Sequence, residues 1–303
     1  MTDHMNVFDR TVLRRHRERA AANFSEHDFL FREIATRLDD RLDDIDRDFP
    51  IALDLGCQGN AMRGLLMNRE RIGAVIGCDN TRSTRVESGY PTLVADEEVL
   101  PFATAGLDLV TSVLNLHWVN DLPGTLAQIR QALRPDGLLL AAILGGVTLY
   151  ELRRALLEAE ADIEDGASPR VSPFVELSDA GGLLQRAGFA LPVADLDTIV
   201  VTWPDMFALM RDLRGMGETN SVRARRKGFT RRETMFAAVK KYHELFADSD
   251  GRIPATFQIV YLTAWAPHEN QQQPLRPGSG DKSLAKALDV EEQSAGDQAK
   301  PKR

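Results

Sequence analysis

The stretch IALDLGCQGN, from Ile51 to Asn60, decides the fold of this 303-residue chain. Its first five residues are mostly apolar and predict a short buried strand. Gly56 and Gly59 stand in the turn that follows, where a missing side chain lets the backbone approach a ligand closely. A helical pattern continues from the turn to about Arg71, so the stretch predicts a strand–turn–helix unit.

Further strands and helices follow along the chain. Apolar runs of strand length occur at residues 74–79, 107–113, 138–144, 194–201 and 256–265. Helical patterns occur at residues 121–133, 148–161, 179–187, 204–216 and 231–246, and residues 134–137 predict a turn. Strands that alternate with helices imply right-handed crossovers, so we expect an α/β fold with a mostly parallel sheet covered on both faces.

The two ends of the chain differ from this central region. Residues 1–48 predict a helical cap of one or two helices. The run Arg14–Arg17 in it could bind a phosphate or an anionic lipid, and we interpret it as a solvated helix face, which such runs more often form. The α/β domain is expected at residues 49–266, with a helical insert on its substrate side at about 203–250. Residues 267–303 are rich in Gln, Pro, Gly, Ser and charge, a composition typical of a disordered tail.

The composition narrows the functional classes. A net charge of -8 argues against general nucleic-acid binding, because proteins that follow phosphate backbones are normally basic. Two cysteines, Cys57 and Cys78, exclude a disulfide scaffold and predict a reducing, cytoplasmic setting. No apolar run is long enough for an integral membrane segment, so any membrane association is expected to come through a partner. The six histidines show no spacing typical of an iron triad, and we predict no metal site.

Acidic residues near the ends of the predicted strands suggest a cofactor site. Asp79 ends the second strand about twenty residues beyond the glycine turn, the distance at which an acid can hold a ribose diol. Asp96 precedes an apolar segment with Leu100, which could accept an adenine amine while the ring packs on hydrocarbon. The candidate cofactor-binding residues are Asp54, Gly56, Gly59, Asp79, Asp96 and Leu100. Taken singly, an acid that ends a strand is more often a turn former or a cap.

Four candidate catalytic residues follow strands at the carboxyl edge of the expected sheet. His117 could act as a general base and Trp118 as an apolar wall, although both could instead pack beneath the N-terminal helices. Tyr150 and Glu151 open the helix after the next strand and could face a substrate cleft, with capping and packing as the alternative.

Glu218 is the candidate that could hold a guanidinium group. It lies in the segment Gly217–Asn220, which predicts a loop, and a carboxylate binds arginine through two parallel charge-assisted hydrogen bonds. Basic residues follow at once, in the segment Arg223–Lys227. They could orient an acidic surface of a partner or simply face solvent.

The order and spacing of the cofactor motifs resemble the S-adenosylmethionine site of class I methyltransferases. The resemblance implies a Rossmann-like sheet of seven strands with an antiparallel last strand. It also implies that Asp54 lies near the methionine end of the cofactor, Asp79 at the ribose and Asp96 at the adenine. The chain departs from the family's Asp-x-Gly-x-Gly-x-Gly turn at Gln58 and Asn60, and a Cβ at Gln58 is expected to crowd the cofactor.

Longer strings extend the resemblance over roughly residues 10–270. These strings are Phe49–Cys57, Ala95–Phe102, Leu116–Pro123, Arg134–Gly137, Gly145–Gly146, Thr148–Arg153, Ser172–Phe174 and Gly215–Asn220. They are similar to the mitochondrial complex I assembly factor 5 family and its bacterial relatives. The resemblance implies a protein partner, the quinone-proximal iron–sulfur subunit of NADH:ubiquinone oxidoreductase, and hydroxylation of one of its arginines during assembly. One further departure is Val147, where these relatives usually have an acid.

Two alternatives stay open. The segments around His117–Trp118 and Thr148–Arg153 also resemble the biotin-pathway malonyl-carrier-protein O-methyltransferases, which implies methyl transfer to a small or carrier-bound acid. The altered residues Gln58, Asn60 and Val147 favour a third hypothesis, a non-catalytic assembly factor with a degenerate cofactor site.

Overall fold

The computed structural model describes residues 6–82, 91–164, 166–272, 279 and 283–290. The chain forms two compact units, residues 1–268 and 269–303. In the second unit, Leu284–Leu288 forms the short helix α9. Much of the predicted disordered tail, at 273–278, 280–282 and 291–303, lies outside the described residues. All candidate site residues belong to the first unit.

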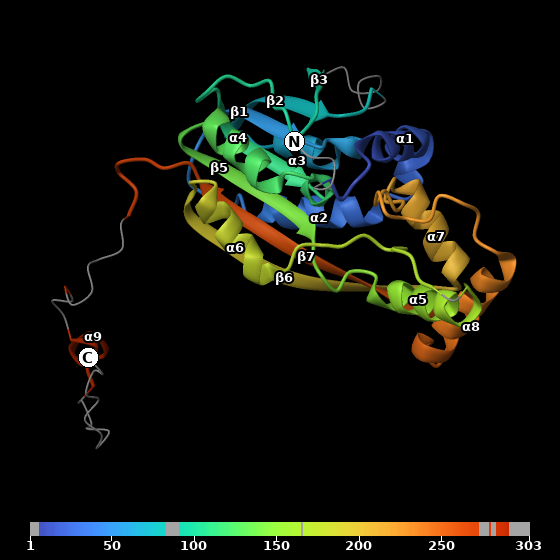
Figure 1. Cartoon of the computed structure of the whole chain (residues 1–303). Coiled ribbons are helices and arrows are strands. Elements are labelled where there is room, and N and C mark those ends of the chain that lie inside the picture. Colours follow the sequence, from blue (N-terminus) through green and yellow to red (C-terminus); the bar gives the residue numbers. More distant parts are fainter. Residues whose placement is uncertain (1–5, 83–90, 165, 273–278, 280–282, 291–303) are drawn as a thin grey trace, which may run out of the picture. The chain divides into compact units, whose positions relative to one another are not determined.

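A seven-stranded sheet forms the centre of the first unit (Figure 1). Its strands run in the spatial order β3-β2-β1-β4-β5-β7-β6. The strands are β1 Phe49–Leu55, β2 Ile72–Asp79, β3 Thr92–Val94, β4 Leu107–Val113, β5 Leu133–Leu144, β6 Ala190–Trp203 and β7 Ile253–Trp265. The first five strands pair in parallel, and β7 runs antiparallel to both of its neighbours. The predicted mostly parallel sheet with an antiparallel last strand is confirmed.

Two details of the sheet differ from the sequence-based prediction. The short strand β3 was not expected, because its three residues show too little apolar periodicity to predict a strand. The predicted turn at residues 134–137 lies within β5, where Asp136 adopts a positive φ of 68° and the pairing with β4 shifts register. The turn residues therefore form a bulge rather than a break between elements.

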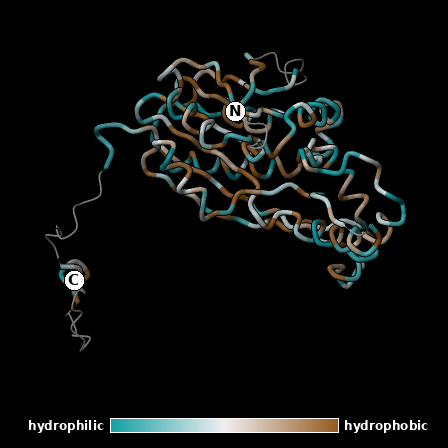
Figure 2. Tube along the Cα trace, viewed as in Figure 1, coloured by the Kyte–Doolittle hydropathy of each residue, from teal (hydrophilic) through white to brown (hydrophobic). Residues whose placement is uncertain are grey.

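Helices cover both faces of the sheet. On one face, α2 Phe29–Asp40 and α3 Ala61–Met67 pack against residues such as Ala52 and Leu140. On the other face, α4 Leu122–Ala132 and α6 Leu177–Arg186 pack against alternate residues such as Leu53 and Leu139. Because both faces are buried, the strands are almost continuously apolar, and Figure 2 shows hydrophobic residues concentrated along them.

The helices α5 Tyr150–Glu164, α7 Met206–Gly215 and α8 Arg232–Phe246 gather at one end of the sheet (Figure 1). Helices α7 and α8 occupy the chain between β6 and β7, as predicted for a helical insert. The exact domain boundaries stay a prediction.

The N-terminal segment is anchored at the carboxyl edge of the sheet. Asp9 caps helix α1, Arg10–Ala20, by accepting a hydrogen bond from the Val12 N–H, and the 3-10 helix η2, Ala21–Glu26, follows. Phe8 forms an antiparallel bridge with Val222. The side chains of Phe8 and Val222 join those of Leu13 and Trp118 in a small buried cluster, which fixes helix α1 against the loop after β4.

Candidate functional site

Strands β1, β2 and β4 bring the predicted cofactor residues to one edge of the sheet. Asp54 lies in β1 opposite Gly77 of β2 and Thr111 of β4, and Asp79 is the last residue of β2. Both carboxylates are almost wholly buried. The Asp79 side chain accepts hydrogen bonds of 2.8 Å from the backbone N–H and the hydroxyl of Thr81. Its Oδ2 has no hydrogen-bond partner within the described residues.

Positions 56 and 59 of the turn need glycine, because the backbone there is left-handed and other side chains lie close to it. Gly56 and Gly59 have φ values of 77° and 73°, in the left-handed region where a Cβ is strained. A Cβ at Gly56 would overlap the Asn115 side chain, and one at Gly59 would overlap the ring of Phe24. The two glycines are therefore in contact with protein side chains.

The two departures from the glycine pattern have a structural explanation. Asn60 adopts a left-handed φ of 56°, which asparagine tolerates better than most residues. Gln58 is buried, and its amide Nε2 donates a hydrogen bond of 3.1 Å to the Met216 carbonyl oxygen at the end of α7. Gln58 therefore joins the turn to the helical insert.

Glu97, rather than the predicted Asp96, turns into the site. The Glu97 carboxylate is fully buried; one oxygen accepts a hydrogen bond of 3.1 Å from the Asn115 amide, and the other accepts one from the Arg10 guanidinium. The Asp96 side chain is 48% exposed and binds Arg10 from the outside at 2.8 Å. Leu100 packs against the apolar cluster beneath α4.

Helix α1 supplies a second arginine that the sequence analysis missed. Arg17 is only 2% exposed and donates a hydrogen bond of 2.6 Å to Asn115 Oδ1, with Glu97 Oε1 at 3.7 Å. The interpretation of the run Arg14–Arg17 as a solvated face is therefore wrong for Arg17. Arg10, Leu13 and Arg17 follow a helical i, i+3, i+7 spacing, and this signal could have shown that they share one face.

Burial dominates the protonation of the two strand acids. It raises the pKa of Asp54 to about 7, although the nearby guanidinium of Arg63 opposes the rise. Burial also raises the pKa of Asp79, against the positive charge of Arg17. Buried acids with raised pKa values are common at functional sites. Ionisation of such an acid in the folded protein lowers the free energy of unfolding.

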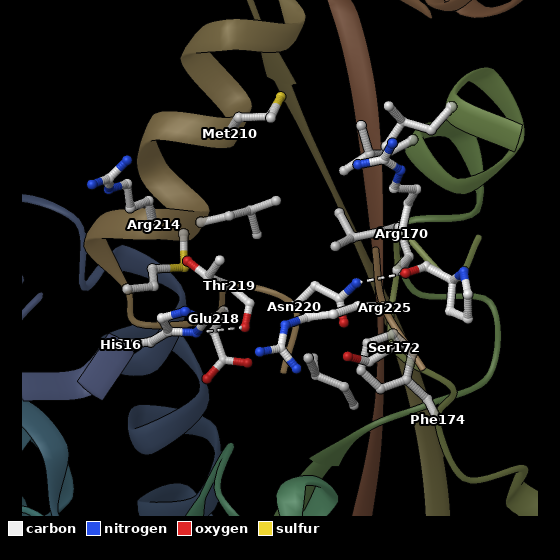
Figure 3. Close-up of a pocket in the computed structure, with 18 of the residues that line it drawn as sticks. His16, Arg170, Ser172, Phe174, Met210, Arg214, Glu218, Thr219, Asn220 and Arg225 are labelled. Carbon is white, nitrogen blue, oxygen red and sulfur yellow. Dashed lines mark hydrogen bonds between the residues drawn. The ribbon is translucent and has the colours of Figure 1, made fainter. Parts of the chain in front are cut away.

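A cavity of about 630 Å³ opens beside this edge, between the helical insert and the segment before α6. Its deep walls are apolar and come from several elements, with Leu30, Leu114, Leu156, Met210 and Phe257 among them. Figure 3 shows His16, Glu218 and Thr219 on one side and Arg170, Ser172 and Phe174 on the other. The size and the mostly apolar lining with a few polar groups are typical of a binding site.

A helix end positions Glu218 in this cavity. Helix α7 ends at Gly215, and Gly217 follows with a left-handed φ of 78°. The Gly217 N–H donates to the Arg214 carbonyl, and the Glu218 N–H donates to the Leu213 carbonyl. These two bonds form a Schellman motif, so Gly217 turns the chain and Glu218 is held directly by the helix terminus.

Glu218 and Trp118 line the cavity, and the buried His117 lies beside them. The Trp118 indole Nε1–H donates a hydrogen bond of 2.8 Å to Glu218 Oε2, and His117 Nε2 lies 3.2 Å from the same oxygen. The Glu218 side chain is 8% exposed, and its Oε1 has no hydrogen-bond partner in the described part of the chain. The structure therefore presents one buried carboxylate oxygen that is available to a ligand.

Tyr150 and Glu151 lie apart from these three residues. The Tyr150 side chain is largely exposed and contacts the edge of the Phe246 ring. The buried Glu151 carboxylate accepts hydrogen bonds of 3.2 Å and 2.5 Å from the Thr256 N–H and hydroxyl. This geometry matches the capping and packing alternative, because it joins α5 to β7. Val147 is exposed in the turn before α5.

The described residues contain neither a candidate metal-binding group nor a candidate membrane-spanning helix. No group of three His, Cys, Asp or Glu side chains there is arranged to hold a metal ion. Among the same residues, no helix combines the length and the apolar character that a membrane span needs.

Comparison with known proteins identifies the family. A family model described as a methyltransferase domain matches residues 53–141. The mitochondrial arginine-hydroxylase NDUFAF5 of Homo sapiens is 45% identical over 287 residues, which cover 92% of this chain and 83% of that protein. The Danio rerio protein of the same name is 43% identical, covering 93% of this chain and 89% of the relative. This chain belongs to the NDUFAF5 family.

More distant relatives agree with this assignment. A malonyl-[acyl-carrier protein] O-methyltransferase of Xylella fastidiosa is 35% identical, covering 86% of this chain and 89% of that protein. Among solved structures, a methyltransferase-like protein of Bacillus halodurans superposes with a TM-score of 0.53 at 14% identity, covering 77% of this chain and 99% of that one. At that identity, the likeness supports the methyltransferase fold alone.

The raised pKa of Asp54 predicts how stability depends on pH. In the unfolded chain an aspartate has a pKa of about 3.9. In the folded protein the pKa of Asp54 is raised to about 7, so Asp54 keeps its proton until about that pH. Ionisation between these values favours the unfolded state. We therefore expect the unfolding free energy of the wild type, relative to Asp54→Asn, to fall by roughly 4 kcal/mol between about pH 4 and 7 and to stay level above that.

Urea unfolding of both proteins between about pH 4 and 8.5 measures this difference. The exposed Asp250→Asn serves as the matched control and should show no such slope. A difference between wild type and Asp54→Asn that does not change with pH contradicts the prediction.

Proposed function

We propose that this protein hydroxylates an arginine side chain of a partner protein, with molecular oxygen as the source of the oxygen atom and an external reductant supplying the two electrons that reduce the second oxygen atom to water. The observation that carries the proposal is the buried Glu218 carboxylate, which has one unpartnered oxygen at the wall of an apolar cavity. The names of the relatives, arginine-hydroxylase in each organism, agree with this chemistry. By the family resemblance, the partner is an iron–sulfur subunit of respiratory complex I, modified during assembly.

The part of the cavity around Glu218 suits an arginine side chain in both polarity and charge. Trp118 and His117 hold Glu218 Oε2, so Oε1 is directed to the guanidinium that we propose as its partner. Apolar walls exclude water around this carboxylate, which strengthens its attraction for a cation. The aliphatic stem of the arginine would pack on Leu114 and Phe174, which both line the cavity. Trp118 and Glu218 are the residues that we place in contact with the substrate.

We also propose S-adenosylmethionine as a cofactor, and the residues present fit its polar groups. Asp79 has a buried Oδ2 available to accept a ribose hydroxyl, and Gly56 keeps the turn beside it narrow. When bound, this cofactor would supply a sulfonium-activated methyl group, which is the chemistry of the O-methylation candidate and does not provide the oxygen atom of a hydroxylation. Phe24 of η2 lies against the turn and Arg17 of α1 lies beside it, so both helices would have to withdraw for the cofactor to approach.

We also propose the cellular compartment in which the protein acts. Cys57 and Cys78 are both buried free thiols, as expected in a reducing compartment, and we place the protein in the cytoplasm. The relatives named above carry a mitochondrial designation.

Calorimetric titration with S-adenosylmethionine and S-adenosylhomocysteine tests the cofactor. We expect micromolar binding by the wild type, at least about tenfold weaker binding by Asp79→Asn, because an amide replaces one of the carboxyl oxygens that can accept a ribose hydroxyl, and tighter binding by Arg17→Ala. Arg19→Ala, on the exposed face of α1, is the control and should match the wild type. No binding by any variant at millimolar ligand contradicts the cofactor and supports a non-catalytic assembly factor, the alternative that the filled turn favours.

Mass spectrometry of the complex I subunit tests the modification. In a strain lacking the gene, we expect the target arginine to lose its added oxygen, and wild-type protein should restore it. Glu218→Gln should restore less than about a tenth, since a neutral amide cannot form the charge-assisted pair. Glu233→Gln, an exposed change on α8, is the matched control and should restore fully. An arginine that is unchanged in the deletion strain contradicts the proposal.

A second candidate function is O-methylation of a carrier-bound acid. Its support is the identity to the malonyl-[acyl-carrier protein] O-methyltransferases and the arginines around the cavity, which would favour an acidic substrate. Growth of a biotin auxotroph that lacks its own methyltransferase tests this candidate. Rescue by the wild type supports it, and absence of rescue by well-expressed protein contradicts it.

A further inference from the structure

The cavity proposed for an arginine is lined by more arginines than acids. Within the described residues, five arginines line it, namely Arg170, Arg211, Arg214, Arg225 and Arg226, against the single carboxylate of Glu218. A cationic side chain that enters would meet this positive charge before it reached Glu218. Glu218 can bind one cation, but it does not account for the excess of positive charge that the five arginines give this cavity.

Three of the five arginines are balanced by acids of the same chain. Arg170 pairs with Glu160, Arg226 pairs with Glu164, and Arg225 lies 3.8 Å from Asp9. These pairs tie the cavity wall to α5 and to the N-terminal segment, and they leave little charge for a ligand.

Arg211 and Arg214 differ from the other three. They stand one turn apart on α7, both side chains are exposed, and neither forms an ion pair with any residue that the structure describes. Residues three apart lie on one face of a helix, so the two guanidinium groups form a pair at the cavity rim. Figure 3 shows Arg214 on the α7 side, above His16 and Glu218.

The pKa of His16 is affected by the positive charge at this rim. Its ring lies at the cavity wall, and its Nδ1 is 3.1 Å from the Thr219 carbonyl oxygen. Burial lowers the pKa of His16, and the charges of Arg19, Arg225 and Arg214 lower it further, although the contact with Thr219 opposes them. Arg225 and Arg214, which both line the cavity, therefore place positive charge near His16. The rim is complementary to a negatively charged group.

The apolar part of the cavity is larger than one arginine stem requires. Leu30, Leu156, Met210 and Met235 line it beyond the residues that surround Glu218, and they come from four different helices. A volume of about 630 Å³ lies within the range of sites that take whole small molecules. Burial of a further large apolar side chain would therefore be favourable.

We propose that the site selects an arginine flanked by large apolar residues and by acidic residues, with Arg211 and Arg214 holding the acidic flank. This inference rests on the proposed function for its central arginine. The acidic flank offsets the repulsion between the entering guanidinium and the rim. Arg211 and Arg214 are thus specificity-determining residues, and Glu218 takes the central cation.

Fluorescence anisotropy with labelled seven-residue peptides tests the proposal on the full-length protein. The first peptide has a central arginine, leucine or phenylalanine beside it and aspartate at both ends. The second has lysine in place of aspartate, and the third has glutamine in place of the central arginine. The proteins are the wild type, Arg211→Glu/Arg214→Glu and the control Arg130→Glu/Arg186→Glu, which makes the same charge change on α4 and α6. Circular dichroism confirms that each variant is folded.

We expect the wild type and the control to bind the aspartate peptide about tenfold more tightly than the lysine peptide, with the difference shrinking at high salt. The Arg211→Glu/Arg214→Glu variant should lose or reverse this preference. A preference that persists in that variant, or that is missing in the wild type, overturns the acidic flank.

The glutamine peptide separates this inference from the proposed function. Weaker binding of the glutamine peptide than of the arginine peptide supports Glu218 as the cation site. Equal binding of the two, together with an aspartate preference that depends on Arg211 and Arg214, overturns the arginine substrate while it supports the acidic-peptide surface.

Discussion

The contact between Arg17 and the carboxyl edge of the sheet is the interaction on which the rest of the site depends. A guanidinium that is 2% exposed would be costly to bury alone, and Glu97 and Asn115 compensate for that cost. Arg10 adds a second link to Glu97 from the same helix. Helix α1 is thereby held where Val12 and His16 line the cavity, and the following helix η2 places Phe24 against the glycine turn.

This arrangement couples two regions that are separate in the sequence. The N-terminal segment pairs with the loop after α7 through Phe8 and Val222, and Trp118 packs between them. Glu218 lies in that same loop and binds the Trp118 indole. Any movement of α1 would therefore change the surroundings of Glu218. The edge of the sheet at the glycine turn and the cavity share this helix, so a ligand bound at one is expected to affect ligand binding at the other.

Buried polar atoms without partners lie on both sides of this helix. Asp79 Oδ2 lies at the end of β2 and Glu218 Oε1 lies in the loop after α7, both within the described residues. Leaving such atoms unsatisfied costs stability, roughly 1–3 kcal/mol each. The rest of the fold, with its two apolar layers packed on a seven-stranded sheet, supplies the stability that tolerates this cost.

The sequence by itself determined the elements whose signals are local. Strand β4 begins and ends at the predicted residues, Leu107 and Val113, because an apolar run between turn signals needs no distant partner to be recognised. Gly217 predicted a loop for the same reason, and its left-handed backbone places Glu218 directly after α7. Net charge and the family motifs are also read without knowledge of the fold.

Only the tertiary structure decided which polar residues face inward. Three acids stand in a row at residues 96–98, and Glu97 is buried because Arg10, 87 residues earlier, meets it there. For Glu151 and Tyr150 the sequence left open a substrate cleft or a packing role, and the structure places Glu151 against Thr256 and Tyr150 against Phe246. Burial and charge pairing of this kind depend on residues far apart in the chain. A local sequence pattern does not show which distant residue will pack against a given position in the folded protein.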